Sequence, residues 1–531
     1  MAEAAGKASA LGERHVVIVG AGVGGLVSAL LLAAKGIRVT LLEMADTPGG
    51  KMRQVMVGGS PIDSGPTVFT MKWVFENIFN QVGCSLNEVL RLQPLDILAR
   101  HAWGADHSRL DLYSDVERSA DAISRFSSPE EAKRFLGFCK KAAEVYHHLE
   151  GPYIRSSRPS LLNMGSDLGP KGLGALASLG PFASLWQALG SHFKDPRLQQ
   201  LFGRYATYCG ASPWLAPATL MLVAHVELDG VWSVQGGMHA LACALADQAQ
   251  RRGTTIRYAS TCRRILVRSG RACGVELMNG EQIHADAVIF NGDIGALSQG
   301  LLGEEVRTSV PVFNRSRSSL SAVTWSVKTK TRGFPLVRHN VFFDEDYAQE
   351  FKDIFQYQRL PGRGTVYVCA QDRDDSGCQP PDAERLLCLV NAPAIGDQNN
   401  FKSMEITPCQ EQSQKLMQQC GLDIDLSAAH MSITSPTDFN RLFPGTGGAL
   451  YGTASHGWMT PFQRPSSQSR LPGLYLAGGS VHPGPGVPMA ALSGQLAAAT
   501  VMAHLVSTKK LGRVRISGGM STPSATMANT P

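Results

Sequence analysis

The chain has 531 residues, of which 44% are hydrophobic and 18% are charged, and its formal net charge is +6. This apolar content excludes disorder for most of the chain, and the length predicts two intertwined domains rather than one compact core. The 50 basic and 44 acidic residues are mixed without blocks of Lys and Arg, which argues against a nucleic-acid partner. Eleven cysteines without a Cys-x-x-Cys pair argue against a disulfide framework or a metal site and favour a reduced, cytoplasmic compartment.

The ends of the chain differ in composition from the rest. Residues 1–12 are rich in Ala and small polar types and are expected to be a flexible leader, and residues 509–531 are expected to be a disordered tail. The most apolar stretch, residues 489–506, contains Ser493, Gln495 and His504. A membrane-spanning helix needs about 20 consecutive apolar residues, so this stretch predicts a buried core helix instead. Any contact with a membrane is therefore expected to be peripheral.

The first regular elements predict a β-α-β unit. An apolar, β-branched run over residues 15–19 predicts a strand, an Ala- and Leu-rich run over 22–35 predicts a helix, and a second apolar run over 38–43 predicts the next strand. The turn between the first strand and the helix fits the pattern G-x-G-x-x-G, and its glycines are Gly20, Gly22, Gly24 and Gly25.

This glycine turn predicts a dinucleotide site. Its glycines permit a tight turn, a close approach of the backbone to a pyrophosphate, and close packing of the helix on the strand. Glu43 ends the second strand, where an acid can accept hydrogen bonds from a ribose and disfavours a 2′-phosphate. NAD and FAD share this motif, so the choice between them depends on the residues that follow.

A second glycine turn, Gly49-Gly50-Lys51, favours FAD. It comes soon after the strand that Glu43 ends, where Gly50 and the Lys51 cation can meet the pyrophosphate from the other side. A simple NAD dehydrogenase does not need such a turn. Gly-Gly-Lys alone is an ordinary turn more often than not, so its position carries the argument.

The middle and the end of the chain predict further pieces of the same domain. Strand-like runs separated by Ser-Gly and Asn-Gly turns predict a β-meander and a core strand over 255–257, 265–268, 274–278 and 287–290. Near the C-terminus, residues 473–477 predict a strand, 478–486 a glycine turn, and the residues from 488 a helix. The predicted nucleotide domain is therefore discontinuous and comprises 13–75, 220–300 and 440–508, with a substrate domain inserted as 76–219 and 301–439.

The C-terminal glycine turn is predicted to hold the flavin end of the cofactor. The N–H groups at the start of the following helix, with its dipole, can stabilise negative charge there. The expected contacts in this block are Gly478, Gly479, Ser480, Gly486, Val487, Pro488 and Met489. Cys262, in the β-meander, is a further predicted cofactor contact. His482, in the same turn, is expected to shape the loop or line the substrate site rather than to act as a base.

An apolar stripe marks the predicted substrate domain. Aromatic and aliphatic residues recur at helical spacing at Phe182, Leu185, Trp186, Leu189 and Phe193. The neighbouring run 161–180 mixes Leu and Ala with Gly and Pro, so a buried core face and a mobile flap at a membrane entrance are both open. Trp186 and Trp232 are predicted to contact the substrate.

The sequence predicts no catalytic acid or base. It contains no Ser-His-Asp spacing, paired carboxylates on one helical face, or cluster of metal ligands. A flavin that takes a hydride from a substrate able to delocalise the resulting charge needs little help from a protein base. We therefore hypothesise that catalysis depends on positioning the substrate against the flavin in a dry tunnel.

The motifs together resemble those of the carotenoid desaturases of the bacterial phytoene desaturase type, within the amine-oxidase-like flavoproteins. The resemblance covers almost the whole chain and depends on residues 16–43, 49–51, 63–67, 232–238 and 478–489. The last block is most similar to that of the 1-hydroxycarotenoid 3,4-desaturases of purple bacteria. One departure is that many relatives have an acid after the C-terminal strand, where this chain has Gly479 and Ser480.

The resemblance implies both a fold and an activity. The fold is α/β (α+β), with a Rossmann-like FAD-binding domain of the glutathione reductase and amine oxidase type and an inserted substrate domain. The activity is formation of the C-3,4 double bond in 1-hydroxycarotenoids such as 1-hydroxyneurosporene, with FAD as the sole redox cofactor. A long apolar polyene is the implied substrate, oxygen or a quinone the electron acceptor, and the surface of the inner, photosynthetic membrane the location.

Three alternatives remain open at this point. Phytoene desaturase is the nearest one. An amine oxidase is disfavoured because the sequence lacks a clustered aromatic signature for an amine cage and a flavin-linking Cys motif. A non-enzymatic isoprenoid-lipid carrier of the GDP-dissociation-inhibitor type shares the fold, but such a carrier has no reason to retain both the Gly49-Gly50-Lys51 turn and the turn at residues 484–489.

Overall fold

A five-stranded parallel sheet joins distant parts of the chain. The computed structural model describes residues 14–157, 183–374, 378, 380, 382–426 and 430–511. The strands lie in the order β21 (Leu474–Leu476), β13 (Ala287–Phe290), β1 (His15–Val19), β2 (Arg38–Leu42) and β9 (Thr255–Arg257). All neighbouring pairs are parallel. Their carboxyl ends therefore meet at one edge, where open α/β sheets bind ligands.

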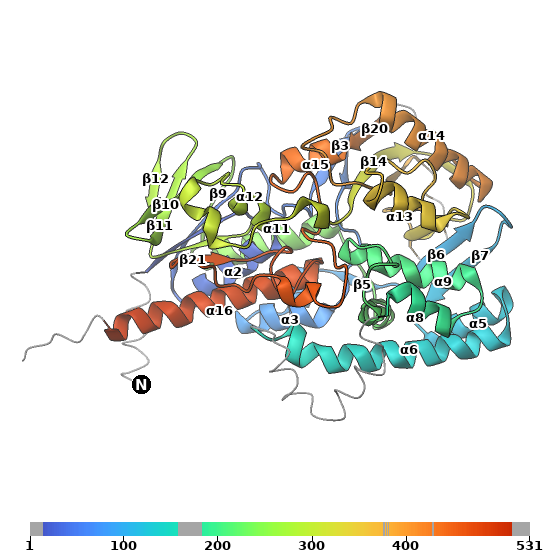
Figure 1. Cartoon of the computed structure of the whole chain (residues 1–531), viewed down its shortest axis with the longest axis horizontal. Helices are drawn as coiled ribbons and strands as arrows, with labels where there is room; N and C mark the ends of the chain where they lie inside the picture. Colours follow the sequence, from blue (N-terminus) through green and yellow to red (C-terminus); the bar gives the residue numbers. More distant parts are fainter. Residues whose placement is uncertain are drawn as a thin grey trace, which may run out of the picture.

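Helices cover one face of this sheet and a small antiparallel sheet covers the other. Val16 and Ile18 share a core with α2 (Val23–Ala33), α3 (Lys72–Gln81), α11 (Met238–Arg251) and α16 (Val487–Leu511). Val17 points the opposite way, toward β10 (Cys262–Arg268), β11 (Arg271–Leu277) and β12 (Gln282–His284). This alternation follows from the two-residue period of a strand buried on both faces. Figure 1 shows these elements together in one half of the molecule.

Helix α16 is long and apolar enough to cross a membrane, which the sequence had not led us to expect of any stretch. By length and composition, Val487–Ser507 is the one helix in the described part of the chain that could cross a membrane, and 44% of its most apolar window is buried. However, Ala491, Ala497 and Val501 belong to the core shared with α2. A helix that is buried in a protein core is apolar as well, so length and composition alone do not identify a membrane span.

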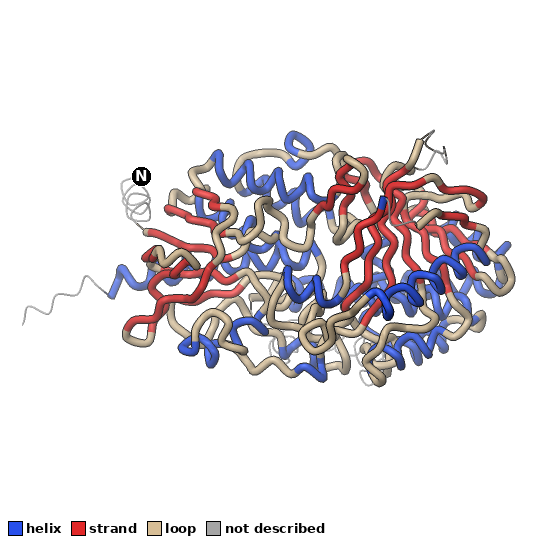
Figure 2. Tube along the Cα trace, turned by 90° about the horizontal axis from the view of Figure 1, so that it is seen from above, coloured by secondary structure: helices blue, strands red, loops and turns tan. Residues whose placement is uncertain are grey.

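The other half of the molecule is built on a seven-stranded sheet. Its strands lie in the order β20 (Met431–Thr434), β14 (Ser321–Thr329), β18 (Glu384–Ala392), β17 (Val366–Ala370), β16 (His339–Phe343), β6 (Ile97–Trp103) and β7 (Arg109–Tyr113). Only β16 and β6 are parallel neighbours. Figure 2 shows the two groups of strands toward opposite ends of the long axis, with helices and loops between them.

The two faces of the seven-stranded sheet face different helices. Phe342 packs in a core with α14 (Ser403–Gln419), whereas Val341 and Phe343 pack on the opposite side. The helices of that second core are α5 (Val116–Phe126), α6 (Pro129–Leu149), α8 (Leu185–His192), α9 (Pro196–Gly203) and α10 (Leu222–Leu228). The face of β16 that carries His339 and Val341 is therefore turned toward these helices.

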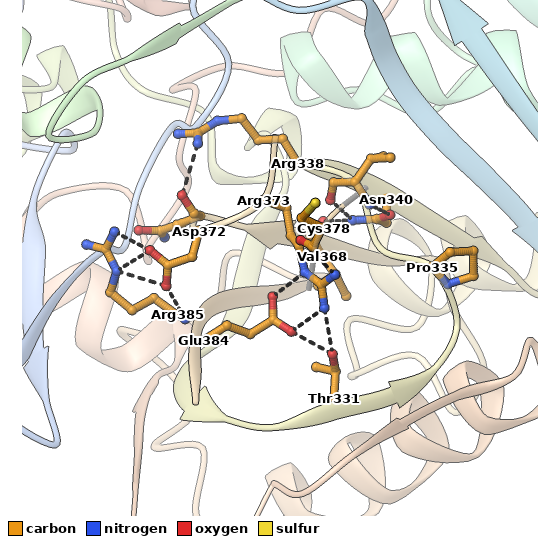
Figure 3. Close-up of polar contacts among 12 residues, drawn as sticks. Thr331, Pro335, Arg338, Asn340, Val368, Asp372, Arg373, Cys378, Glu384 and Arg385 are labelled. Atoms are coloured by element: carbon orange, nitrogen blue, oxygen red, sulfur yellow. Dashed lines mark hydrogen bonds and ion pairs between the residues drawn. The ribbon is translucent and has the colours of Figure 1, made fainter. Parts of the chain in front are cut away.

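Two ion pairs beside each other in this half differ in burial (Figure 3). The Arg373 guanidinium donates to both oxygens of Glu384 at 2.8 Å, and both side chains are at most 3% exposed. Thr331 donates to the same carboxylate at 2.6 Å, so the buried charges are fully hydrogen-bonded. Arg385 and Asp372 form the second pair, which is about one-third exposed.

Shorter elements connect the halves and complete the fold. They are β3 (Gln54–Val57), β4 (Ser60–Asp63), β5 (Leu92–Pro94), β8 (Trp232–Val234), β15 (Thr331–Gly333), β19 (Leu422–Ile424), α4 (Leu86–Val89), α12 (Ile294–Ser298), α13 (Tyr347–Phe355) and α15 (Pro436–Leu442). The predicted α/β fold class is confirmed. The predicted domain bounds stay a prediction, and the one between residues 75 and 76 falls within α3. Residues 1–12, most of the tail and the run 161–180 lie outside the described residues.

Candidate active site

The first glycine turn packs closely against neighbouring backbone atoms. Gly20 has φ 101° and donates its N–H to Leu42 O at 2.7 Å, which fixes the turn at the end of β1. A Cβ on Gly25 would collide with Gly20 O, and a Cβ on Gly24 would lie 2.9 Å from Gly478 N. Side chains at these positions are therefore excluded. This leaves the start of α2, with its unpaired N–H groups, directly behind the turn as an anion site.

Glu43 is buried at the end of β2, where the sequence places it. Its carboxylate accepts hydrogen bonds from Ala21 N at 2.6 Å and from Ala45 N at 2.9 Å. These bonds hold the carboxylate against the glycine turn. Each carboxylate oxygen keeps further acceptor capacity, so the group can still accept from ribose hydroxyls.

The second glycine turn lies against the first. Gly49 N donates to Ala21 O at 2.8 Å, and a Cβ on Gly50 would lie 3.3 Å from Gly22 Cα. Lys51 Nζ donates to Leu450 O at 2.5 Å. Burial lowers the pKa of Lys51, while Asp293 nearby opposes that shift. The structure thus brings a cation and both glycine turns together.

The C-terminal turn meets the same place from β21. Gly478 N donates to Ser493 Oγ at 3.0 Å, and Ser480 Oγ accepts from Ile294 N at 3.2 Å. Helix α16 begins at Val487, so the N–H groups of Val487 and Met489 lie in its first turn, where the flavin end is predicted to bind. Gly479 also contacts Arg464, whose Nη1 donates to Gly479 O at 3.2 Å.

Cys262 lies at the start of β10, next to the strand end that carries Glu43. Ser260 N, two residues earlier, donates to Glu43 O at 2.8 Å. Burial raises the pKa of the Cys262 thiol to about 12, so the group is a neutral thiol rather than a thiolate. Its predicted contact with the cofactor stays a prediction.

Two site residues escaped the sequence interpretation, Asn291 and Asp293, which follow β13. Asn291 Nδ2 donates to Gly20 O at 3.0 Å, and its Oδ1 is buried without a hydrogen-bond partner among the described residues. Asp293 accepts from Gly295 N at 2.9 Å, and burial raises its pKa while Lys51 opposes the rise. A polar pair directly after a buried parallel strand is the signal that could have found them.

His482 is buried and contacts the helical part of the other half. Its Nε2 lies 2.8 Å from Ser156 O, and its ring packs edge-on against Tyr153 at 5.0 Å. Burial lowers the pKa of His482 to about 4, so the ring is neutral near pH 7. A neutral ring bonded to a loop carbonyl fits the predicted loop-shaping or substrate-lining role.

The two tryptophans predicted to contact the substrate lie in separate clusters. Trp186, in α8, packs against Trp214 in a tilted arrangement with ring centroids 4.5 Å apart, and it lies beside Tyr347. Trp232 packs edge-on against Phe69 at 6.4 Å. Leu185, Leu189 and Phe193 are fully buried, so this part of the stripe is a core face, while Phe182 lies outside the described residues. No ring contact within the described chain joins Trp186, Trp232 and His482.

The residues present fit FAD. The glycine turns, the Glu43 carboxylate, the Lys51 cation and the start of α16 converge on one edge of the parallel sheet. The buried Asn291 Oδ1 without a protein partner is the kind of acceptor that a bound group satisfies. The fold and this site therefore define a dinucleotide-binding flavoprotein.

Comparisons with known proteins identify the family. Residues 23–502 match the family described as flavin containing amine oxidoreductase, and the chain belongs to that family. It is 63% identical over 519 residues to a hydroxyneurosporene desaturase of Rubrivivax gelatinosus, covering 98% of this chain and 99% of that protein. It is 43% identical to a hydroxyneurosporene desaturase of Cereibacter sphaeroides, covering 93% of this chain and 99% of the relative. The chain is therefore an FAD-dependent oxidoreductase.

Solved structures agree on the fold. An oxidoreductase from Methanosarcina mazei has a TM-score of 0.59 at 17% identity, and it covers 92% of this chain and 100% of its own. Putrescine oxidase bound to putrescine has a TM-score of 0.56 at 15% identity, covering 92% of this chain and 99% of its own. At this identity the likeness concerns the fold alone.

Proposed function

We propose that the protein is an FAD-dependent carotenoid desaturase that forms the C-3,4 double bond of 1-hydroxycarotenoids such as 1-hydroxyneurosporene. The observation that carries this proposal is the 63% identity to a hydroxyneurosporene desaturase over almost the full length of both chains. The intact site supports it, because Glu43, Lys51 and the glycine turns are all in place to hold FAD. This disfavours a lipid carrier without redox chemistry.

The residues of the site divide the work of holding the cofactor. Glu43 is placed for the ribose, the start of α2 for the pyrophosphate, and the first turn of α16 for the flavin ring. Lys51 and Arg464 add two buried cations beside Asp293. When bound, FAD accepts the hydride that leaves the substrate.

The protein's remaining task is to position the polyene and exclude water. His482 is neutral near pH 7 and bonded to a carbonyl, so it orders its loop without placing a charge beside an apolar substrate. Positioning against the flavin then supplies most of the catalysis.

The substrate's low solubility in water supports a peripheral position at the inner, photosynthetic membrane. Oxygen or a quinone would reoxidise the flavin, and a membrane quinone fits that position. Co-sedimentation with anionic lipid vesicles tests the location, and recovery of all the protein in the supernatant would contradict it.

Product analysis tests the proposed reaction. FAD-loaded protein is incubated with 1-hydroxyneurosporene in liposomes, with an electron acceptor, and the product is examined by mass and absorption spectrum. We expect loss of two hydrogens per molecule and a red shift of the polyene. Conversion of phytoene in place of the hydroxylated substrate would move the assignment to phytoene desaturase.

A further inference from the structure

Arg204 places a buried positive charge beside the aromatic core of the helical half. It opens the short helical turn Arg204–Cys209 that follows α9, next to the fully buried Phe202 and Tyr205. Within the described chain its guanidinium makes one hydrogen bond, from Nη2 to the Tyr208 hydroxyl at 3.4 Å, and no ion pair. A guanidinium has several N–H donors, so most of those of Arg204 lack a protein acceptor.

Glu227 organises the groups around Arg204 without pairing with it directly. It is 4% exposed and accepts hydrogen bonds from Tyr205 at 2.7 Å and from Tyr208 at 2.9 Å. Burial opposes the charge of Arg204, but Tyr208 and Glu227 raise the pKa of Arg204, so it stays a cation. A largely desolvated cation with so few acceptors is costly, and an additional ligand would offset that cost.

The two tyrosines that donate hydrogen bonds to Glu227 differ in exposure. Tyr205 is 2% exposed and belongs to the buried core. Arg204 and Tyr208, by contrast, both retain partial exposure. This partial exposure leaves Arg204 and Tyr208 open to a ligand, whereas core side chains enclose the Tyr205 ring.

Two series of contacts connect Arg204 to the segments that are expected to hold the flavin. On one side its guanidinium lies 5.6 Å from the Tyr367 ring, and the Tyr367 hydroxyl bonds to Thr67 at 2.6 Å. Thr67 ends the 63–67 motif, in which Gly65 packs directly on the Lys51 carbonyl.

The second series of contacts leads to the C-terminal glycine turn. A Cβ on Gly210, just beyond the Arg204 turn, would lie 2.7 Å from the Tyr451 ring. The Arg464 Nη1 group donates to Tyr451 O at 3.5 Å and to Gly479 O at 3.2 Å. These contacts link the Arg204 turn to the C-terminal glycine turn that is expected to hold the flavin.

We propose that Arg204 and Tyr208, held by Glu227, bind the hydroxyl group at the end of the carotenoid substrate. The hydroxyl accepts from the free N–H groups of Arg204 and donates to the oxygen of Tyr208. This inference rests on the proposed function, because in a 1-hydroxycarotenoid a single carbon separates the hydroxyl-bearing carbon from C-3. A group that binds the hydroxyl must therefore lie close to the flavin, and the contacts through Tyr367 and Tyr451 connect Arg204 to the segments that are expected to hold it.

The same arrangement rejects substrates without the hydroxyl. An apolar chain end would leave the Arg204 cation dry and unpaired, whereas a hydroxylated end satisfies it. Arg204 and Tyr208 thus determine specificity and leave the hydride transfer to the flavin. Selectivity for the hydroxylated carotenoid over the same carotenoid without the hydroxyl is the quantity that they set.

Matched tyrosine variants test the proposal. Tyr208→Phe and Tyr205→Phe each remove one hydroxyl from Glu227, but only Tyr208 is partly exposed. The ratio of kcat/KM for 1-hydroxyneurosporene to kcat/KM for neurosporene is measured in liposomes for the FAD-loaded proteins. We expect Tyr208→Phe to lower the ratio about 5- to 20-fold and Tyr205→Phe to leave it within twofold. Equal effects of the two variants would overturn the proposal.

Arg204→Met provides a second test that does not depend on the tyrosines. We expect the ratio to fall about 10- to 100-fold, with neurosporene converted faster than by wild type, and FAD affinity by flavin fluorescence unchanged. An unchanged ratio in an active variant would reject the hydroxyl site and leave the desaturase assignment standing. Wild-type protein that converts neither carotenoid would reject the proposed function itself.

Discussion

Helices α2 and α16 cross so closely at Gly24 and Gly494 that adding one methyl group there should force the two helices apart. A Cβ on Gly494 would lie 2.9 Å from Gly24 Cα and closer still to Gly24 O, whereas ordinary contact begins at 3.4 Å. Gly494→Ala therefore requires the helices to move apart by at least about 0.5 Å, since backbone atoms cannot rotate away. Overpacking of this kind costs about 1–3 kcal/mol. Because Gly24 is part of the first glycine turn, FAD affinity should fall as well.

Gly137, in the exposed middle of α6, is the matched control. A Cβ there meets nothing within 4 Å, so Gly137→Ala should raise stability by about 0.5–1 kcal/mol through helix propensity alone. Denaturant unfolding followed by circular dichroism gives the stability of both variants, and flavin fluorescence titration gives their FAD affinity. If Gly494→Ala is stabilised as much as Gly137→Ala and binds FAD normally, the reasoning about the crossing is wrong.

Three further predictions concern charge. Arg373→Met should lower the free energy of unfolding by about 3–5 kcal/mol, because it leaves the Glu384 carboxylate buried and unpaired. Arg385→Met, in the more exposed pair, should lower it by under about 1 kcal/mol. Equal losses in denaturant unfolding would refute this. Glu43→Gln should weaken FAD binding at least about tenfold and the exposed Glu304→Gln not at all, as flavin fluorescence titration would show; the account of the ribose site requires this difference. Burial lowers the pKa of His101 from 6.5 to about 3, so the unfolded chain binds a proton below pH 6.5 that the folded chain refuses, and stability is lost as pH falls. In denaturant unfolding, His101→Gln should therefore lose about 2 kcal/mol less than wild type between pH 7 and pH 5, and identical pH profiles would contradict the shift.

Local patterns were sufficient to predict the nucleotide half. The strands over residues 15–19 and 287–290 have the bounds that their apolar, β-branched runs predict. The glycine turns and Glu43 could be placed because each depends on backbone geometry within a few residues. FAD as cofactor followed from their order along the chain.

The parts that could not be predicted depend on contacts between distant segments. Asn291 and Asp293 reach the site only because β13 pairs with β1, across some 270 residues of chain. The Arg204 turn has no motif of its own, and its importance follows from Glu227 and Tyr367, which come from elements that the sequence gives no reason to bring together. The stripe around Trp186 was ambiguous because helical spacing alone does not say what covers it.

The central claim is that this chain holds FAD against a carotenoid, so that a hydride passes from the carotenoid to the flavin. Anaerobic mixing of the FAD-loaded protein with 1-hydroxyneurosporene in liposomes tests this most directly, by following the flavin and polyene absorption together. The account predicts flavin bleaching and a red shift of the polyene at equal rates and in equal amounts. Bound FAD that stays oxidised while the polyene spectrum remains unchanged would contradict it.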